Sequence, residues 1–371
     1  MRLLVLTRYG CRGASSRIRM GQFLPYLRER GIEPVTSPLL SDSYLNELYR
    51  HHRRRLRELL AMYSRRIRDT ATSRRFDAIW LEKELLPYAP AWVEAVAGLG
   101  SLPYVVDYDD AVFHTYDAHR LAPVRALLGG KIDAIMRRAA AVTAGNPYLV
   151  SRAQRAGARR VELIPSVVDT SRYRLSRPPS RYPFTVGWIG TPVTASYLRQ
   201  IAPSLKELSV AGPLRIMAIG AGELDLAGLP VELHDWSEET EAELLNEVDV
   251  GVMPLPDEPW ERGKCGYKLI QYMASGLPVV ASPVGVNVDI VKNGVSGFLA
   301  SSGREWTESL SALRASPAMR AALGAEGRRI AEQSYSLQAV APTVAAVLLD
   351  AASNRCANKR SSNTVGCVKE G

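Results

Sequence analysis

Short apolar runs alternate with stretches of helical spacing along the first half of the chain. An apolar run over residues 3–7 is followed by a loop with two glycines and a helical stretch that ends at Gly31. Further apolar runs, each separated by material with helical spacing, lie at 78–81, 104–107, 141–144 and 161–164. This alternation of strand and helix predicts a parallel sheet covered by helices on both faces.

The same alternation starts again in the second half of the chain. Its apolar runs lie at 184–189, 214–219, 231–233, 248–253, 279–281 and 298–299. Two successive parallel-sheet units of similar length predict an α/β fold class with two Rossmann-like domains facing each other across a cleft.

Domain boundaries follow from the segments that lack an apolar period. We expect a first domain over 1–167 and a linker over 168–183, where Arg, Ser, Tyr and Pro accumulate. A second domain over 184–335 and a C-terminal helix over 336–352 follow. The segment 353–371 is polar and aperiodic, so we expect a loose tail there.

Composition places the chain among ordinary globular proteins. Its 371 residues are 46% hydrophobic and 23% charged, which excludes a disordered, collagen-like or disulfide-dense protein. The four cysteines form no C-x-x-C pair, so neither a zinc site nor a disulfide framework is supported. The first apolar run is too short for a signal peptide, and no run approaches the roughly 18 apolar residues of a spanning helix. We therefore expect a soluble, cytoplasmic protein.

Positive charge is concentrated in one window. The net charge is +9, and residues 50–75 hold ten arginines against two acids. The rest of the chain is nearly neutral, which disfavours nucleic acid as a partner. One helix face in this region is apolar and the arginines are expected on the other faces; the apolar face consists of Leu45, Leu48, Tyr49, His52, Leu56, Leu59, Tyr63 and Ile67.

Two interpretations of this basic helix remain open. It is either a solvated helix packed on its own domain or a docking surface. We favour docking, through Arg53, Arg54 and Arg57, on anionic lipid or on an acidic lipid-linked or polysaccharide acceptor. The protein would then be peripheral on the inner face of a membrane.

The segment 262–282 carries the most specific chemistry. Gly263 and Gly266 bracket a loop that precedes a short helix and a buried strand. Lys264 and Lys268 lie beside the N-terminus of that helix, where free backbone amides favour anions. A glycine loop, a helix N-terminus and two cations suit a diphosphate. The alternative, two solvated lysines on a surface helix, is disfavoured because the loop precedes a buried strand of an α/β sheet.

Neighbouring residues extend this predicted nucleotide-sugar site. Tyr267 opens the helix, and Gln271 lies one turn beyond Lys268, where its amide can bond a sugar hydroxyl. At the start of the second domain, Gly190 lets the backbone approach a ligand, and Thr191 can donate its hydroxyl or cap the next helix. Ligand binding and plain turn chemistry are both open for this pair.

The first domain offers two candidate clusters. Ser16, Arg17 and Arg19 begin a helix after the first strand, as an acceptor-binding anion site or as an N-capped surface helix. At a spacing of two, only one of the arginines can point straight at a ligand. Asp110 and His114 follow a later strand and are candidate catalytic residues that orient an acceptor hydroxyl.

Metal binding is the alternative for the acids near Asp110. Asp107, Asp109 and Asp110 are closely spaced, but nearby acids more often cap helices and turns. We therefore expect no metal site and no other cofactor.

The second half of the chain resembles a known family. Residues 263–285 read Gly-Lys-Cys-Gly-Tyr-Lys-Leu-Ile-Gln-Tyr-Met-Ala-Ser-Gly-Leu-Pro-Val-Val-Ala-Ser-Pro-Val-Gly, and Gly294 and Gly297-Phe-Leu follow. This stretch resembles the carboxyl-terminal signature of family 4 retaining glycosyltransferases of the GT-B fold (glycosyl transferases group 1). Asp249–Leu255 and Gly187–Gly190 are similar to neighbouring pieces of the pattern.

The resemblance implies a function for each domain. The second domain would hold a nucleotide-diphosphate sugar, and the first a glycan or lipid-linked acceptor. The implied enzyme is a retaining, metal-independent hexosyltransferase, which we place in cell-envelope polysaccharide synthesis. The leaving diphosphate would be stabilised by Lys264, Lys268 and the helix amides.

The chain departs from the family pattern at three places. Two glutamates that are usually separated by seven intervening residues are replaced by Gly263 and Gln271. The basic pair usually found after the first strand of this domain is replaced by Trp188-Ile-Gly-Thr-Pro. Lys264 and Lys268 are the candidate substitutes for the phosphate contacts. Two alternatives stay open: a catalytically idle scaffold that binds nucleotide or glycan, and a nucleotide-sugar epimerase of the same architecture.

Overall fold

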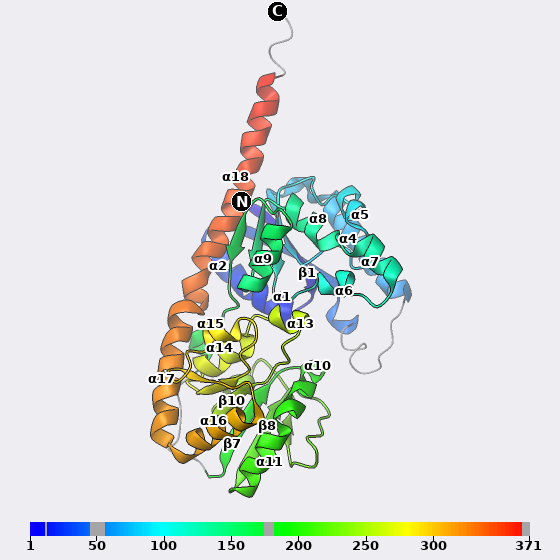
Figure 1. Cartoon of the computed structure of the whole chain (residues 1–371). Coiled ribbons are helices and arrows are strands. Elements are labelled where there is room, and N and C mark those ends of the chain that lie inside the picture. The colour runs from blue at the N-terminus through cyan, green and yellow to red at the C-terminus, as the bar shows by residue number, and fades with distance from the viewer. Residues whose placement is uncertain (12, 45–55, 174–181, 366–371) are drawn as a thin grey trace, which may run out of the picture. The chain divides into compact units, whose positions relative to one another are not determined.

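The apolar runs of the sequence form the strands of two separate six-stranded sheets. The computed structural model describes the chain except for residues 12, 45–55, 174–181 and 366–371 (Figure 1). One sheet lies in a first unit made of Met1–Pro165 and Val340–Gly371, and the other in a second unit, Ser166–Ala339. The prediction of two Rossmann-like α/β domains is confirmed. Their facing each other across a cleft stays a prediction.

The sheet of the first unit has the strand order β2-β1-β3-β4-β5-β6, with every pairing parallel. β3, β4 and β5 are buried along their whole length, which explains their near-continuous apolar sequences. The strands are β1 (Arg2–Tyr9), β2 (Glu33–Leu40), β3 (Ala78–Glu82), β4 (Tyr104–Tyr108), β5 (Ala141–Ala144) and β6 (Val161–Leu163).

One strand of this sheet, β2, has no counterpart among the predicted runs. Its sequence EPVTSPLL contains two prolines and several polar residues. Proline removes a backbone donor, so it is tolerated on a strand at the edge of a sheet, which is where β2 lies. The edge position therefore explains why the hydrophobic pattern of this strand is weak.

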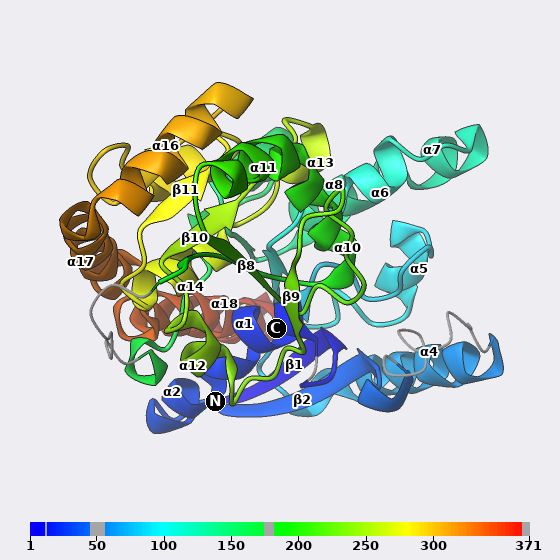
Figure 2. The ribbon, with the colours of Figure 1, turned by 90° about the horizontal axis from the view of Figure 1, so that it is seen from below.

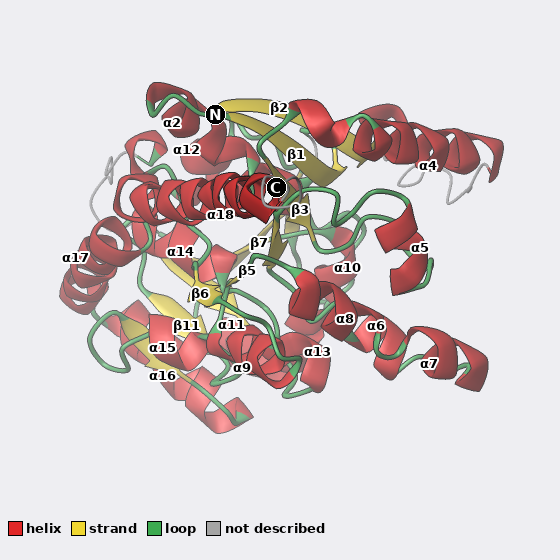
Figure 3. Cartoon of the chain, turned by 90° about the horizontal axis from the view of Figure 1, so that it is seen from above, coloured by secondary structure: helices red, strands yellow, loops and turns green. Residues whose placement is uncertain are grey.

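Helices flank the first sheet, and three of them, α4, α5 and α7, lie toward one side of the unit. In Figures 2 and 3, α5 lies between α4 and α7. The α-helices that the structure describes within Met1–Pro165 are α1 (Ala14–Arg19), α2 (Leu24–Glu29), α4 (Leu56–Ala71), α5 (Ala91–Val96), α6 (His114–Asp117), α7 (Ala122–Leu128), α8 (Lys131–Arg138) and α9 (Pro147–Arg155).

The second unit repeats the architecture with the strand order β12-β11-β10-β7-β8-β9, again parallel. Its strands are β7 (Phe184–Ile189), β8 (Leu214–Ile219), β9 (Glu232–His234), β10 (Val250–Met253), β11 (Val279–Ala281) and β12 (Gly297–Leu299). Its helices are α10 (Pro192–Ala195), α11 (Ala202–Val210), α12 (Glu241–Leu245), α13 (Pro259–Arg262), α14 (Tyr267–Ala274), α15 (Asn287–Ile290), α16 (Gly303–Ala315) and α17 (Pro317–Ser334).

Both faces of the second sheet are covered by apolar side chains. Along β7, Val186 and Trp188 pack in one core, whereas Ile189 packs in the other. Along β11, Val280 belongs to the first of these cores and Val279 to the second. Because successive side chains of a strand point to opposite faces, this division shows helices packed on both sides of the sheet.

The predicted linker and tail differ from the structure. The linker was expected from residue 168, but Val168 and Tyr173 are buried in the core of the second unit. The tail was expected from residue 353, but α18 runs from Leu337 to Val365 as one helix. Residues 353–365 contain neither glycine nor proline, so nothing in them stops a helix that is already formed.

The basic helix α4 also differs from its predicted pattern. Met62 and Thr70 are buried, and so is Arg66, whose guanidinium donates to the carbonyl oxygens of Thr7 and Ser37. Burial lowers the pKa of Arg66 to about 10. Ile67, expected on the apolar face, is 40% exposed. The prediction that the arginines occupy only the open faces is therefore wrong at Arg66, because strand carbonyls next to the helix need a donor.

Part of the predicted docking surface lies outside the described residues, namely Arg53 and Arg54. Arg57 is described and exposed. Within the described ranges, none of the helices combines the length and the hydropathy needed to cross a bilayer.

Candidate functional site

The predicted diphosphate loop joins α13 to α14 in the second unit. Gly266 precedes α14 with a φ of 64°, and a Cβ atom at this position would clash with the Cδ1 atom of Ile290. Both facts explain why glycine occupies this turn. Gly263 is buried and has an ordinary φ of −79°. Lys264, between the two glycines, is half-buried.

Lys268 lies in the first turn of α14 and reaches the end of β7. Its Nζ atom is 4.9 Å from the centroid of the Trp188 ring and donates to Thr194 Oγ1 over 3.2 Å. A Cβ atom on Gly190 would clash with that ring and lie 2.7 Å from Lys268 Cε. Gly190 therefore gives Trp188 and Lys268 room to meet at the carboxyl end of β7, the edge where parallel sheets bind ligands.

Thr191 has a structural role that is visible in the same turn. It is the N-cap of α10, and its backbone N–H donates to Thr194 Oγ1 over 3.3 Å. Its side chain is exposed. The turn-chemistry interpretation accounts for Thr191, whereas its predicted contact with a ligand stays a prediction.

Gln271 is buried in a polar network. Its Nε2 atom donates to Glu241 Oε2 over 3.2 Å and lies 3.3 Å from the hydroxyl of Tyr173. Glu241 also accepts hydrogen bonds from Tyr173 and from Trp236 Nε1, each over 2.8 Å. Burial raises the pKa of Tyr173 well above its ordinary value, so this hydroxyl remains a donor. The amide nitrogen of Gln271 is thus engaged inside the protein. The half-buried Tyr267 packs against the same core, and its role in the site stays a prediction.

Glu241 was not predicted as a site residue. It lies in the polar stretch Ser237–Glu243, which also contains other acids, so the sequence gives no signal that separates it from its neighbours. Only the packing of Gln271, Tyr173 and Trp236 around it shows that this one carboxylate is buried.

In the first unit, charged side chains gather at the carboxyl ends of β3 and β4. Lys83 Nζ lies 2.9 Å from Asp109 Oδ1 and 3.4 Å from Asp110 Oδ2. Ser15 Oγ donates to Asp109 Oδ2 over 2.5 Å. The side chain of Asp110 is 30% exposed and that of Asp109 13%, so Asp110 is the more accessible carboxylate.

Lys83 sets the charge state of this cluster. Burial alone would lower its pKa, but Asp109 and Asp110 outweigh burial and raise it. In the same way burial would raise the pKa of Asp109, but the Lys83 ammonium outweighs burial and lowers it. Lys83 also has a φ of 62°, a left-handed conformation that is costly outside glycine and that clusters at functional sites where it persists.

Glu82 lies beside Lys83 and is almost fully buried. Its Oε2 atom accepts from Ser16 Oγ over 2.5 Å and from the backbone N–H of Arg8 over 2.7 Å. Burial raises the pKa of Glu82. The side chain of Ser16 is thereby directed into the unit. The predicted contact of the Ser16 backbone amide with an acceptor stays a prediction.

Arg19 is likewise an interior residue. Its Nε and NH2 atoms donate to the two carboxylate oxygens of Asp107 over 2.9 and 2.7 Å, and NH1 donates to the Ile164 carbonyl over 2.8 Å. Arg19 and Asp107 are each 2% exposed. The prediction that Arg19 binds the acceptor is corrected, because a carboxylate buried in β4 requires a cation there. Arg17, half-buried on the same helix, remains a candidate.

His114 is the first residue of α6, and both of its ring nitrogens have a hydrogen-bond partner. Nδ1 lies 2.8 Å from Asp117 Oδ1, and Nε2 lies 2.8 Å from the hydroxyl of Tyr148. Arg152 in turn pairs with Asp117 over 2.9 Å. To act on an acceptor hydroxyl, His114 has to exchange one of these two partners. Among the residues that the structure describes, no group of three or more His, Cys, Asp or Glu side chains is arranged to hold a metal ion.

The charged residues after β3 were missed by the sequence argument. The apolar run 78–81 is directly followed by Glu82, Lys83 and Glu84. Charged residues at the carboxyl end of a buried strand can indicate a ligand site, so the sequence did contain a signal for them. Glu84 pairs with the buried Lys131 over 2.6 Å. This second ion pair requires contact between distant segments, which no local pattern predicts.

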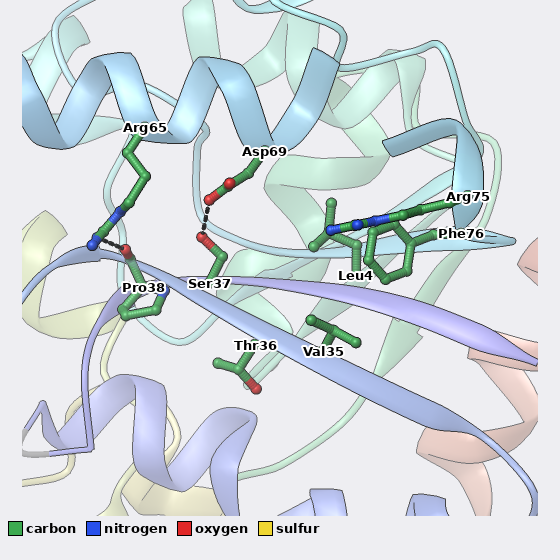
Figure 4. A pocket seen from close by; sticks show the side chains of 9 residues that line it. All are labelled: Leu4, Val35, Thr36, Ser37, Pro38, Arg65, Asp69, Arg75 and Phe76. Carbon is green, nitrogen blue, oxygen red and sulfur yellow. Dashed lines mark hydrogen bonds between the residues drawn. The ribbon is translucent and has the colours of Figure 1, made fainter. Parts of the chain in front are cut away.

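A cavity of about 260 Å³ lies under α4 in the first unit (Figure 4). Arg65 and Asp69 reach down from α4, where Arg65 donates to the Pro38 carbonyl over 2.6 Å and Asp69 accepts from Ser37 Oγ over 2.6 Å. The lining comprises Leu4, Val35, Thr36, Ser37, Pro38, Arg65, Asp69, Arg75 and Phe76. None of the residues predicted to bind donor or acceptor is among them.

Comparison with known families supports the assignment of the second unit. Residues 184–315 match the family model described as glycosyl transferases group 1. The second unit is similar to this family over that range. The range includes β7, the Gly190 turn and the whole loop from Gly263 to Lys268, so the resemblance drawn from these motifs is confirmed.

A curated relative matches part of the chain. D-inositol 3-phosphate glycosyltransferase from Geodermatophilus obscurus is 35% identical over 159 residues, which are 42% of this chain and 33% of that protein. The match therefore spans about a third of the length of this relative.

Solved structures match nearly the whole chain. Sucrose-phosphate synthase from Thermosynechococcus elongatus has a TM-score of 0.70 at 15% identity and covers 93% of this chain and 97% of its own. Anabaena HepE in complex with UDP-glucose has a TM-score of 0.68 at 17% identity, with 94% and 100% covered. WaaG, a glycosyltransferase involved in lipopolysaccharide biosynthesis, has a TM-score of 0.64 at 14% identity, with 94% and 99% covered. These likenesses confirm the GT-B type of fold.

Proposed function

We propose that the protein is a glycosyltransferase that transfers a sugar from a nucleotide-diphosphate donor to a lipid-linked or polysaccharide acceptor in cell-envelope glycan synthesis. The observation that carries the proposal is the family match over residues 184–315, which contains the Gly263–Lys268 loop. The binding of UDP and UDP-glucose by the structural neighbour HepE supports this class of donor.

In the proposed reaction, the second unit stabilises the leaving group. Negative charge grows on the diphosphate as the glycosidic bond breaks, and preorganised cations and amides lower the energy of that state. Lys264, Lys268 and the N-terminus of α14 supply them. Trp188 and Thr194 hold the Lys268 ammonium at the carboxyl end of β7, so little reordering is needed when the donor binds.

In the proposed reaction, the first unit orients the acceptor. Asp110 is the accessible carboxylate of the Lys83 cluster and is suited to accept a hydrogen bond, and then the proton, from the acceptor hydroxyl. Lys83 Nζ lies 3.4 Å from that carboxylate and can help to orient it. His114 is the second candidate for this role, and Arg17 is a candidate contact for an anionic acceptor.

Further features of the proposed enzyme follow from the sequence resemblance. We infer a retaining transfer that requires no metal or other cofactor, at the inner face of a membrane. Arg53, Arg54 and Arg57 would attract anionic lipid or an acidic acceptor to the first unit.

One observation favours a second candidate, a catalytically idle scaffold that binds nucleotide or glycan. In this chain Gly263 brings no side chain to the loop, and the amide nitrogen of Gln271 bonds Glu241 inside the unit. Donor binding without turnover would fit this arrangement.

Turnover of a panel of nucleotide-diphosphate sugars, with and without a glycan acceptor fraction, tests the proposal. We expect nucleoside diphosphate release together with extension of the acceptor. Binding of the donor without any product would support the scaffold, and isomerisation of the donor would show an epimerase. Either result would contradict the transferase.

A further inference from the structure

Backbone strain is concentrated in one loop of the first unit, residues 83–90, which joins β3 to α5. Among the residues that the structure describes, the non-glycine residues with a positive φ are Lys83, Tyr88 and Ala227. Lys83 and Tyr88, at 62° and 59°, both lie in this loop. Bulky side chains rarely adopt this conformation, which persists only where the surrounding structure holds it and which clusters at ligand-binding segments. The loop is therefore a candidate for such a segment.

Buried charged groups hold the loop in its strained shape. Lys131 Nζ pairs with Glu84 over 2.6 Å and donates to the Leu86 carbonyl over 2.7 Å. The Glu94 carboxylate accepts from the backbone N–H groups of Leu85 and Leu86, each over 3.1 Å. Lys131 is 3% exposed and Glu94 is fully buried, so these charge-assisted bonds are shielded from water and strong. The loop is thus fixed before any ligand arrives.

Tyr88 is the residue that this loop presents to solvent. Its backbone N–H donates to the Tyr116 hydroxyl over 3.0 Å. Its ring meets those of Tyr116 and His119 at nearly right angles, with centroid distances of 5.5 and 6.5 Å. Tyr116 is 1% exposed, whereas Tyr88 is 56% exposed. A fixed aromatic ring is therefore held open on a strained backbone, which indicates that it has a partner outside the chain.

Tyr88 adjoins the residues proposed to orient the acceptor. Lys83, in the same loop, contacts Asp110 over 3.4 Å. Five residues span at most about 18 Å even when fully extended, so Tyr88 lies within the length of a short oligosaccharide from Lys83. Tyr116, against which the Tyr88 ring packs, belongs to α6, whose first residue is His114. The open ring therefore belongs to the same part of the unit as both candidate catalytic groups.

An open aromatic ring with polar neighbours suits a sugar. A pyranose ring has a face of C–H groups that packs on an aromatic ring, and a rim of hydroxyls that needs hydrogen-bond partners. In the segment that packs against Tyr88, Thr115 and His119 are half-buried and Arg120 is exposed. Tyrosine also provides a large contact area at a low cost in conformational entropy.

We propose that the Tyr88 ring stacks on a pyranose ring of the acceptor, next to the sugar that receives the transfer. This inference deepens the proposed function and rests on it for the identity of the acceptor. It makes the acceptor a glycan of at least two sugars, whether or not a lipid carries it. Tyr88 would then select acceptors by their second sugar, while Asp110 or His114 acts on the first.

Saccharide binding by the full chain, measured by NMR titration without donor, tests the stacking. The probes are mono-, di- and trisaccharides of glucose, galactose, mannose and N-acetylglucosamine. We expect the wild type to bind a di- or trisaccharide more tightly than the matching monosaccharide. Tyr88→Gly should weaken binding of that oligosaccharide about tenfold, because it removes the apolar ring. Glycine adopts a positive φ without strain, so this variant should stay folded. Tyr88→Phe keeps the ring and should retain most of the affinity.

Tyr182→Gly is the matched control. Tyr182 is 81% exposed and precedes β7 in the second unit, at the end of that strand opposite the edge where parallel sheets bind ligands. It should bind as the wild type does, and thermal melts check that all variants are folded. Equal oligosaccharide binding by the wild type and Tyr88→Gly, an equal loss in Tyr88→Phe or Tyr182→Gly, or no saccharide binding by the wild type would each overturn the proposal. So would self-association that only Tyr88→Gly loses, because the partner would then be a second copy.

The same samples distinguish failure of the stacking from failure of the proposed function. UDP binding, measured by calorimetry without saccharide, reports on the donor site alone. Saccharide binding that depends on Tyr88, without binding of any nucleoside diphosphate, would support the sugar site and contradict the transferase. Sugar transfer to an oligosaccharide with the same KM in the wild type and Tyr88→Gly would support the transferase and overturn the stacking.

Discussion

The two units place charged groups at the carboxyl ends of their strands in different ways. In the second unit, Lys264 in the loop before α14 and Lys268 in the first turn of α14 belong to one short segment and are half-buried. In the first unit, Glu82, Asp107 and Lys131 come from separate elements and are buried. The half-buried cations remain able to meet a ligand, whereas most of the buried charges neutralise one another.

This difference predicts different consequences of mutation. A half-buried cation in a loop contributes little to folding, so its loss should affect ligand binding. A buried charge that loses its partner destabilises the fold, because desolvation is no longer compensated. The second unit should therefore show binding defects, and the first unit stability defects, from comparable substitutions.

The largest expected effect is that of Arg19→Met. The substitution leaves the buried Asp107 carboxylate without its bidentate partner and should cost about 3–5 kcal/mol of unfolding free energy. Urea denaturation measures this loss. Arg17→Met, on the same helix, is the control and should cost less than about 1 kcal/mol. Similar losses for both variants would remove the contrast between buried and half-buried charges.

A smaller effect, on binding alone, is expected for Lys268→Ala. Loss of a charged hydrogen bond should weaken nucleoside diphosphate binding by about 1.5–3 kcal/mol and leave binding of the nucleoside unchanged. Lys264→Ala should behave in the same way. Calorimetry checks this, with the exposed Lys292→Ala as a control. Equal losses for nucleoside and diphosphate would contradict the phosphate assignment.

The Lys83 cluster predicts a pH effect in the first unit. The folded-state pKa of Asp109 is below its ordinary 3.8, so its contribution to stability is present above that pH. The contribution is lost as the pH falls through the lower folded value. In Lys83→Met, burial is opposed less strongly, by Arg19 and the Ser15 hydrogen bond, and the Asp109 pKa should rise by at least about one unit.

Carbon-13 NMR of the Asp109 carboxyl follows this titration. Ser15→Ala removes only a hydrogen bond to the same carboxylate and should raise its pKa less. An Asp109 pKa that stays below 3.8 in Lys83→Met would show that the ammonium is not the cause.

The smallest effect is expected for metal removal. Asp107 is paired with Arg19 and Asp109 with Lys83, so these carboxylates already have cationic partners. Transferase activity should survive EDTA within about a factor of two, whereas a Lewis-acid role is worth several kcal/mol. Activity lost in EDTA and restored by magnesium or manganese would contradict the proposed metal independence.

Local patterns predicted most of the fold. Buried strands such as β3 and β4 have continuous apolar sequences, and the glycines around α14 fix the turns of the donor loop. The hydrophobic pattern did not predict β2, because an edge strand tolerates proline and polar residues. The sequence did not predict the full length of α18, because a polar segment without glycine or proline continues a helix as readily as it forms a tail.

The candidate site was only partly predictable, for a physical reason. The Gly263–Lys268 loop is contiguous, so its spacing could be read directly. The pairing of Arg19 with Asp107, and of Gln271 with Glu241, depends on which distant segments pack together. Sequence spacing identifies a charged residue but does not tell whether its partner is a ligand or another residue of the chain.

Hydrogen–deuterium exchange of the full chain, with and without UDP, tests the central claim most directly. If the second unit binds the donor through the loop at α14, UDP should slow exchange in residues 263–268 and in the turn at 188–191. Exchange in the buried ion-pair cluster of the first unit should change little, because that cluster serves the fold. Protection that is absent from both second-unit segments, at a UDP concentration that saturates binding, would contradict the account.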